Sequence, residues 1–315
     1  MALKDVNVQS PGSDAAQAPR SPRLRRNNIL LAGGVLLVVA LVAVALWYFV
    51  VQVPHNEAAA AFSEAVEQYD AAVDDLNART HELDSAIAEL QAVIDSDAQP
   101  LDPTLLTNAS AAIGEAQSSK ADAPASPEHP ESTQDIQNAT DDMPALTADV
   151  ERLGDYSAPI ASLKESQAAL EASIAQLAQV TNPDEAFVIG RIKGLPTIAG
   201  VQAVTEEHDP NGNLNKQGGY TAALYLASTL VDQASVLGND IVDKGTDAGG
   251  AVEVYSTADD AGKRNAYLGA FDGSILASGS HAVVGTVVIR TSNKLTASQQ
   301  TELETAIREA LTRLN

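Results

Sequence analysis

One uncharged apolar stretch near the N-terminus constrains this chain more than any other feature. It runs for 23 residues from Ile29 to Val51 and reads ILLAGGVLLVVALVAVALWYFVV. At a rise of about 1.5 Å per residue, an α-helix of this length crosses the roughly 30 Å hydrocarbon core of a bilayer. The sequence therefore predicts one transmembrane helix over residues 29–53, with a short arm of residues 1–28 before it.

The charges on the two sides of the apolar stretch predict its direction. The arm carries five basic and two acidic residues, and Arg25 and Arg26 stand just before the stretch. Short basic flanks stay in the cytoplasm. We therefore expect a cytoplasmic N-terminus in the plasma membrane, with the bulk of the chain outside and with Trp47 and Tyr48 at the outer interface.

A cleaved signal peptide is the alternative interpretation of this stretch. Ala43-Val44-Ala45 has the small-residue pattern of a cleavage site. However, the apolar core of a signal peptide spans only about 7–15 residues, and this stretch continues beyond the tripeptide to Val51. We therefore predict an uncleaved anchor. The arm, rich in proline, serine and alanine, is expected to be disordered.

Residues 54–182 are strongly acidic, with four basic and 24 acidic residues. From Phe62 to Ile94, apolar residues recur at alternating spacings of four and three, which indicates one long helix with a continuous seam. Only Pro54 marks a break between this helix and the transmembrane stretch. Alanines such as Ala65 and Ala72 widen the seam, which favours a helical bundle over a two-stranded coiled coil.

Three shorter apolar stripes follow and supply partners for the long helix. A proline-containing loop at 118–132 separates the first two, and Pro144 is expected to kink or restart the second near Met143. The prediction is an all-α antiparallel helical-bundle or coiled-coil stalk. It has an outward helix over about 56–97, a return leg in two pieces and an outward helix over about 157–181. Self-association through this stalk is one expected interaction.

The composition changes again near Asn182-Pro183, where glycine, tyrosine and β-branched residues become concentrated. Residues 183–315 are expected to form an α+β head with an antiparallel or mixed sheet and helices mainly on one face. Strands are expected near 200–207, 220–227, 252–256 and 283–291. Thr257 with Asp260, and Thr296 with Gln299, predict N-caps of the last two helices. The chain is thus predicted to be a membrane-anchored, multi-domain protein.

The turn at 208–213 holds the one metal candidate of the sequence. Asp209, Asn211 and Asn213 form a D-x-N-x-N pattern similar to the start of a calcium loop. The pattern lacks the glycine and glutamate that an EF-hand needs at its sixth and twelfth positions, so a turn centred on Asn-Gly is the favoured alternative. The five histidines have no metal-binding spacing, and no zinc site is expected.

No complete catalytic motif is present in the sequence. The glycine-rich stretch 245–250 lacks the G-K-[ST] ending of a phosphate loop, and Ser278-Gly279-Ser280-His281 is not a nucleophile elbow. We therefore expect no cofactor and no enzymatic activity, and the acidic head disfavours nucleic acid. An extracytoplasmic enzyme that uses Asp209, Asp247 and His281 is kept as an alternative.

Three stretches of the head carry a family resemblance: EEHDPNGNLNKQGGYTAALY, KGTDAGGAVEVYSTADDAGKRNAYLGAFDG and ASGSHAVVGTVVIRTSNKLTASQQ. The head, residues 184–315, resembles the C-terminal module of membrane-anchored surface proteins of Gram-positive bacteria labelled EbhA-like, after extracellular-matrix-binding proteins. This resemblance implies adhesion. The expected function is a single-pass surface protein whose stalk presents the head to a protein, glycan or envelope polymer. A regulatory or structural envelope subunit that acts through the stalk is the further alternative.

Overall fold

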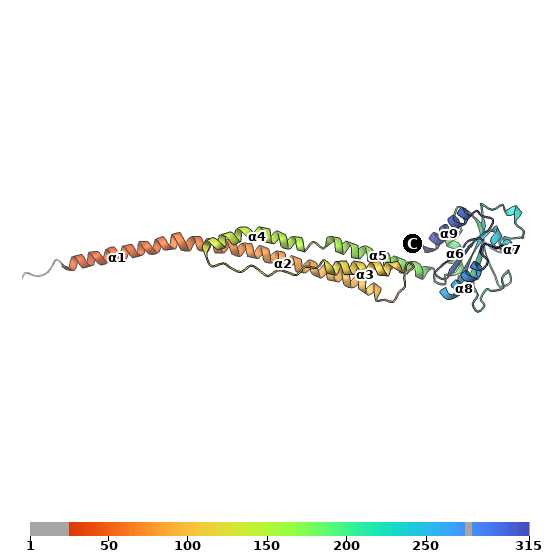
Figure 1. Ribbon diagram of the computed structural model, residues 1–315, viewed down its shortest axis with the longest axis horizontal. Helices are drawn as coiled ribbons and strands as arrows, with labels where there is room; N and C mark the ends of the chain where they lie inside the picture. Colours follow the sequence, from red (N-terminus) through yellow and green to blue (C-terminus); the bar gives the residue numbers. More distant parts are fainter. Residues whose placement is uncertain (1–24, 275–278, 315) are drawn as a thin grey trace, which may run out of the picture. The chain divides into compact units, whose positions relative to one another are not determined.

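The fold is that of a computed structural model, which describes residues 25–274 and 279–314 (Figure 1). The chain divides into two compact units. One comprises the chain up to Ala72 together with Ala125–Asp149, and the other comprises Val73–Pro124 together with Val150 to the C-terminus. Most of the predicted N-terminal arm, residues 1–24, lies outside the described residues.

The predicted apolar helix is present as α1 (Arg25–Trp47), and a π-helical turn (Tyr48–Gln52) joins it to α2 (Val53–Ile94). Trp47 and Val53 both keep helical backbone angles, and the Val53 N–H donates to the Tyr48 carbonyl five residues back. The predicted break at Pro54 is therefore wrong, because the helix continues through a π turn.

Helix α2 buries one column of the seam that its sequence predicts, whereas Val66, Val73 and Ile87 of the other column are half-buried. Of the alanines beside the main apolar column, Ala58, Ala72 and Ala86 are buried with it, and Ala65 is half-buried. The buried residues of α2 are Ala58, Phe62, Tyr69, Ala72, Leu76, Leu83, Ala86 and Leu90. The wide apolar face expected from the alanine positions is therefore present.

Helices α3 (Thr104–Ser118) and α5 (Ser157–Gln179) pack against each other in opposite directions. Just before α3, the Leu101 N–H donates to the Ser173 carbonyl at 3.0 Å, near the end of α5. Just after α3, the Ala121 N–H donates to the Tyr156 hydroxyl at 3.0 Å, at the start of α5. These two contacts fix the antiparallel arrangement.

Helix α4 (Thr133–Leu153) runs parallel to α2. Its first residue, Thr133, lies 3.1 Å from the ring of His55 near the start of α2. Just beyond its end, the Gly154 carbonyl accepts a hydrogen bond from Arg79, farther along α2. The sequence predicts that two helical pieces, here α3 and α4, both run opposite to α2. This prediction is wrong for α4. The chain returns through α3 and residues 119–132, and α4 runs in the direction of α2.

Pro144 lies inside α4, which continues without a restart. A proline in a helix interior costs about 3 kcal/mol. Ile136, Met143 and Val150 on the same helix are at most 2% exposed, and each buried side chain of this size contributes about 1.5–3 kcal/mol. Burial on both sides of the proline therefore outweighs the lost hydrogen bond, and the predicted restart is wrong.

Residues 119–132 form an extended segment, which we call the strap, rather than the flexible loop that the prolines predict. Its half-buried residues recur at every third position, the period of a polyproline II helix. They are Ala121, Pro124, Pro127 and Pro130. Lys120 pairs with Asp84 at 2.7 Å, and His129 packs edge-on against Phe62. The prolines thus place one side of the strap on α2.

The head contains one antiparallel five-stranded sheet, as the α+β prediction requires. The strands are β1 (Ile198–Ala203), β2 (Tyr220–Ser228), β3 (Gly249–Tyr255), β4 (His281–Val284) and β5 (Val287–Thr291), in the order β1-β2-β3-β5-β4. The single strand predicted over 283–291 is wrong. Gly285, with a φ of 57°, and Thr286 form a tight turn that divides it into β4 and β5.

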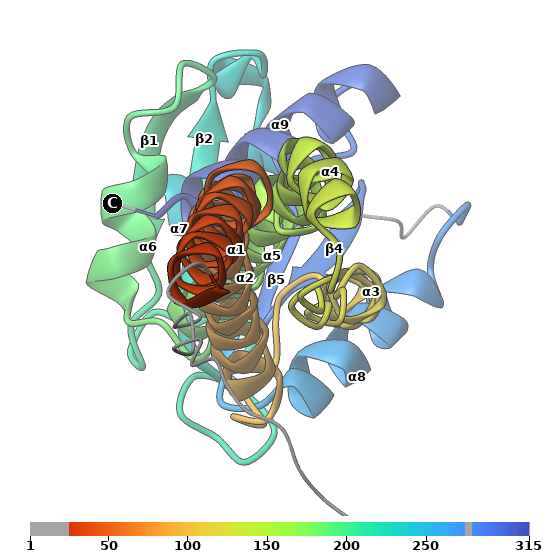
Figure 2. The ribbon, with the colours of Figure 1, turned by 90° about the vertical axis from the view of Figure 1, so that its left-hand side faces the viewer.

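Both faces of the sheet are covered, so the prediction of helices mainly on one face is wrong. Helices α6 (Glu185–Ile192) and α9 (Ala297–Thr312) pack on the face that carries Leu224 and Val252. Helices α7 (Ile241–Lys244) and α8 (Ala258–Gly269) pack on the other. Figure 2 shows α9 and α8 on opposite sides of β4 and β5. Strands apolar on both faces require this double cover.

The end of α5 is built into the head. Val180 is fully buried in the core beneath α6 and α9, and its carbonyl accepts the Thr286 N–H at 3.0 Å. The Asn182 N–H donates to the Thr286 hydroxyl at 2.6 Å, and the Asn182 side chain accepts from Thr221 at 2.7 Å. The helix that enters the head is therefore fixed to the β4–β5 turn by both packing and hydrogen bonds.

Both predicted N-caps are confirmed. The Thr257 side chain accepts from the Asp260 N–H at the start of α8. At the start of α9, the Thr296 side chain accepts from the Gln299 N–H, and the Gln299 side chain accepts from the Thr296 N–H at 2.9 Å. This reciprocal capping box fixes where α9 begins.

Candidate functional site

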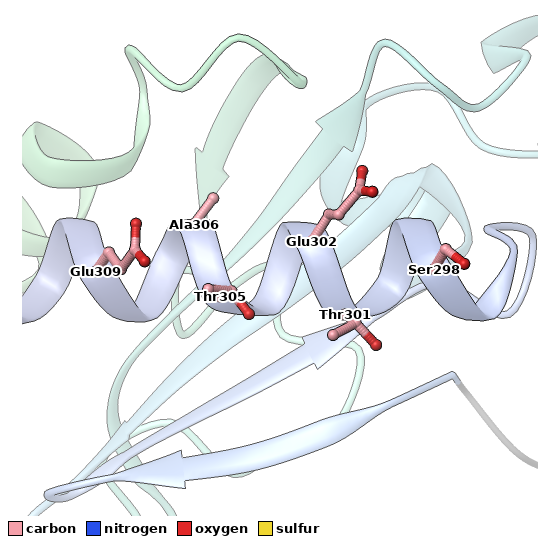
Figure 3. A pocket seen from close by; sticks show the side chains of 6 residues that line it. All are labelled: Ser298, Thr301, Glu302, Thr305, Ala306 and Glu309. Atoms are coloured by element: carbon pink, nitrogen blue, oxygen red, sulfur yellow. The ribbon is translucent and has the colours of Figure 1, made fainter.

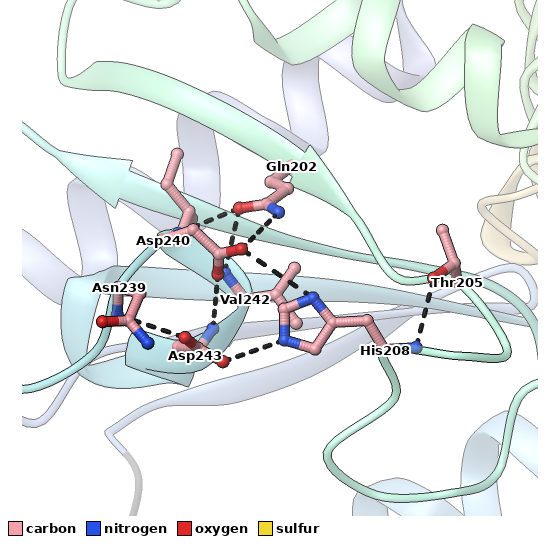
Figure 4. Close-up of polar contacts among 8 residues, drawn as sticks. Gln202, Thr205, His208, Asn239, Asp240, Val242 and Asp243 are labelled. Carbon is pink, nitrogen blue, oxygen red and sulfur yellow. Dashed lines mark hydrogen bonds and ion pairs between the residues drawn. The ribbon is translucent and has the colours of Figure 1, made fainter.

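The structure brings together three ionisable side chains that lie far apart in the sequence. His208 follows β1, whereas Asp240 and Asp243 lie at the start of α7, and Figure 4 shows all three pointing toward one another. The His208 Nε2 lies 2.9 Å from Asp243 Oδ1, and its Nδ1 lies 3.8 Å from Asp240 Oδ2. The side chains are 31–42% exposed, so the cluster is open to solvent.

Local structure holds this cluster in place. The Asp240 side chain caps α7 by accepting the Asp243 N–H at 2.9 Å, and Val242 between them is fully buried. On the other side, the His208 N–H donates to the Thr205 carbonyl at 3.0 Å in a tight turn after β1. Buried apolar packing and backbone hydrogen bonds therefore position all three side chains.

The pKa of each of the two carboxyl groups is lowered from its usual range. For Asp240, the hydrogen bond from the Asp243 N–H is the main cause, followed by the one from Gln202 at 3.0 Å. For Asp243, the hydrogen bond with His208 is the main cause of the lower pKa, followed by the Asn239 N–H. The cluster therefore places one imidazole beside two carboxylates.

The calcium candidates of the sequence serve a different purpose. The Asp209 carboxylate accepts the N–H groups of Asn211, Asn213 and Leu214 at 2.6–3.0 Å and the hydroxyl of Tyr220. A carboxylate offers about four lone-pair sites, and these donors occupy all of them. The Asn211 side chain donates instead to Tyr225 at 3.2 Å. Asp209 thus organises the loop between β1 and β2.

This loop gives a pH-dependent prediction. Burial alone would raise the pKa of Asp209, but the hydrogen bonds from Tyr220 and the backbone outweigh burial and lower it. Its stabilisation is therefore present above the unfolded pKa of about 3.9 and is lost as the pH falls through the lower folded value. We expect Asp209→Asn to destabilise the head by about 1–2 kcal/mol at pH 7.

Hydrogen exchange of the β1 and β2 amides in the full chain, from pH 7 to pH 3, measures this effect within the head. The difference between wild type and Asp209→Asn should shrink as the pH falls below about 4. A difference that stays constant over this range would show that the ionised form of Asp209 is not what stabilises the loop.

Each of the other candidate residues contacts a different set of partners. In the glycine-rich stretch 245–250, the last two residues are in β3, where a Cβ on Gly250 would lie 2.4 Å from the Arg290 carbonyl. Asp247 pairs with Lys294 at 3.7 Å. His281 contacts Asn265 at 2.7 Å and Asp272 at 3.3 Å, and Ser278 lies outside the described residues. No hydrogen bond or ion pair among the described residues joins Asp209, Asp247 and His281.

A buried ionic network lies under α8, on the face of the sheet that carries Tyr225 and Ala251. Glu253 is 2% exposed. Arg264 contacts its carboxylate through two nitrogens at 2.7 and 2.9 Å, and Arg290 contacts it at 2.8 Å. The Tyr255 hydroxyl donates to it at 2.9 Å. Burial alone would raise the pKa of Glu253, but the two guanidinium groups outweigh burial and lower it.

The outer side of α9 forms a surface depression lined by side chains of that helix alone (Figure 3). Its lining is small and polar or acidic, and five of its six residues are exposed. The lining residues are Ser298, Thr301, Glu302, Thr305, Ala306 and Glu309. Because a single helix supplies all of them, the depression is an open helix face and not an enclosed binding cavity.

The residues that the sequence predicts as a membrane anchor lie on α1 and the π turn. Within the described residues, this is the one helix with an apolar window long enough to cross a membrane, and none of that window is buried. Trp47 and Tyr48 are about half exposed at its end. Arg25 and Arg26 form the first turn of α1.

Comparison with protein-family models, with curated proteins and with solved structures gives no match. The candidate site therefore depends on geometry alone. The sequence gives little warning of it, because the partners of His208 are carboxylates more than 30 residues away and not a second histidine at a short spacing. The one local feature that could have pointed to the site is Asp240, which is the N-cap residue of α7.

Proposed function

We propose that the protein is a single-pass cell-surface protein that presents its α+β head on a helical stalk for binding or adhesion. The observation that carries the proposal is the unburied apolar window of α1, continuous through the π turn with α2. A soluble protein rarely exposes an apolar surface of this length. The arginines at the start of α1 and the acidic helices after it support a cytoplasmic N-terminus.

The joint between α5 and the head supports presentation at a fixed position. Val180 is buried in the head core, and Thr286 bonds to the chain at Val180 and Asn182. A flexible linker at this point would instead let the head move freely. The occupant that we propose for the head is a surface protein, a glycan or an envelope polymer, in line with the EbhA-like resemblance.

Lysine in the middle of α1 tests the anchor. Leu41→Lys should lower the fraction of the chain that resists alkaline extraction from membranes, because a central lysine costs about 2.5–3.5 kcal/mol on insertion. Leu146→Lys is the matched control, since Leu146 is an exposed leucine of α4. Equal extraction of both variants and wild type would contradict an anchoring role for α1.

Binding of the full chain in lipid nanodiscs tests presentation. We expect retention on at least one of three supports: immobilised matrix proteins, a glycan array or purified bacterial envelope polymer. Empty nanodiscs are the control. No retention on any support would contradict the adhesive function while leaving the anchor test unaffected.

A further inference from the structure

We propose that His208, Asp240 and Asp243 bind a divalent transition-metal ion, and that Zn²⁺ is the ion this ligand set favours. The donor atoms of the three side chains all lie within 4.8 Å of one another. Zn²⁺ binds imidazole nitrogen and carboxylate oxygen at about 2.0–2.2 Å and takes one nitrogen of each ring. Asp243 faces Nε2 of His208 and Asp240 faces Nδ1, so one ion at Nε2 requires the ring and the Asp240 carboxylate to turn toward each other. Three protein ligands leave a further position for water or a partner group.

Hydrogen bonds from the backbone hold both carboxylates in place, as is usual for carboxylates that bind a metal ion. Each uses its far oxygen to accept a backbone N–H: Asp240 Oδ1 from Asp243 at 2.9 Å, and Asp243 Oδ2 from Asn239 at 3.1 Å. The near oxygens, Asp240 Oδ2 and Asp243 Oδ1, face the imidazole of His208 (Figure 4). Such outer partners fix the direction of ligand lone pairs before the metal arrives.

Gln202 of β1 strengthens this arrangement from a second element. Its amide nitrogen donates to Asp240 Oδ2 at 3.0 Å, and its amide oxygen accepts the N–H groups of Ile241 and Val242 at 2.9 and 3.2 Å. The amide therefore ties β1 to the first turn of α7. A metal ion at the cluster would add a second link between the chain after β1 and this turn.

Charge and ligand type favour a transition metal over calcium. Asp240 and Asp243 place two carboxylates within 4.8 Å of one another, and their negative charges repel. A divalent cation relieves this repulsion. Ca²⁺ prefers six to eight oxygen ligands and no nitrogen, whereas imidazole with carboxylate suits Zn²⁺. The competing interpretation is that His208 is simply an imidazolium paired with two carboxylates.

Calorimetric titration of the full chain in detergent, after treatment with a chelator, tests the proposal with Zn²⁺ as the probe. We expect one Zn²⁺ per chain and an affinity at least tenfold higher than that for Ca²⁺. His208→Gln and Asp240→Asn should each lower Zn²⁺ affinity at least tenfold, and Gln202→Ala by about 10–100-fold. Asn still caps a helix, so Asp240→Asn separates ligand loss from unfolding.

His81→Gln is the matched control, because His81 is an exposed histidine on α2, and its Zn²⁺ affinity should equal that of wild type. Co²⁺ provides a second measurement, since a paramagnetic ion at the cluster should broaden the His208 ring signals in NMR spectra. Absence of Zn²⁺ binding would overturn the proposal. So would binding that survives in His208→Gln and disappears in His281→Gln, which would place the ion at His281.

Discussion

Glu253→Gln should lower the free energy of unfolding of the head by about 3–5 kcal/mol. The substitution removes one negative charge and leaves Arg264 and Arg290 without their ionic partner beneath α8. Their side chains are only 16% and 10% exposed. Water therefore cannot replace the lost interaction, and the cost is that of two poorly solvated cations rather than of one hydrogen bond.

Hydrogen exchange of the β3 and β5 amides in the full chain measures this loss of stability within the head. A global unfolding curve is less suitable, because a chain of two units is not expected to unfold in a single transition. Glu302→Gln is the control. It changes an exposed glutamate on the outer side of α9 and should alter stability by less than about 0.5 kcal/mol. A loss below about 1 kcal/mol in Glu253→Gln would contradict a stabilising network.

Gly285→Val should cost about 2–5 kcal/mol and loosen the joint between α5 and the head. Gly285 has a φ of 57°, and a left-handed conformation costs other residues about 1–2 kcal/mol. A Cβ here would also lie 2.4 Å from the Val180 carbonyl oxygen, and overpacking of this kind costs about 1–3 kcal/mol. The Val180 carbonyl, which the new side chain would displace, accepts the Thr286 N–H and so fixes α5 to the β4–β5 turn.

Limited proteolysis of the full chain between residues 180 and 184 reads out this joint, together with hydrogen exchange at β4 and β5. Gly262→Ala is the matched control, because nothing lies within 4 Å of its added Cβ and α8 is helical at this position. It should be neutral or stabilising by up to about 1 kcal/mol. Equal protease resistance of Gly285→Val and wild type would contradict a tight joint.

The features that the sequence predicts well depend on short-range patterns. The four-three repeat from Phe62 to Leu90 marks the packed side of α2, with every seventh residue from Phe62 buried and Val66, Val73 and Ile87 half-buried, because neighbours on a helix surface are three or four residues apart. Thr296 and Gln299 form their capping box within one turn. The alternation of turns and β-branched stretches likewise predicts a sheet that is antiparallel or mixed, although not its full set of strands.

The features that the sequence does not predict depend on distant partners. Gly285 divides a continuous apolar stretch because its backbone must pass close to Val180, which lies far away in the sequence. The strap follows α2 because its prolines present every third residue to a partner helix. The cluster of His208, Asp240 and Asp243 exists only because α7 packs against the end of β1.

Labelling of intact cells tests surface presentation most directly. The chain contains no cysteine, so single cysteines at Thr301→Cys in the head and Ser13→Cys in the arm report only their own positions. With a membrane-impermeant maleimide, we expect Thr301→Cys to react on intact cells and Ser13→Cys to react only after permeabilisation. Wild type is the unlabelled control. Reaction of Ser13→Cys on intact cells, or protection of Thr301→Cys until permeabilisation, would contradict an external head on a membrane anchor.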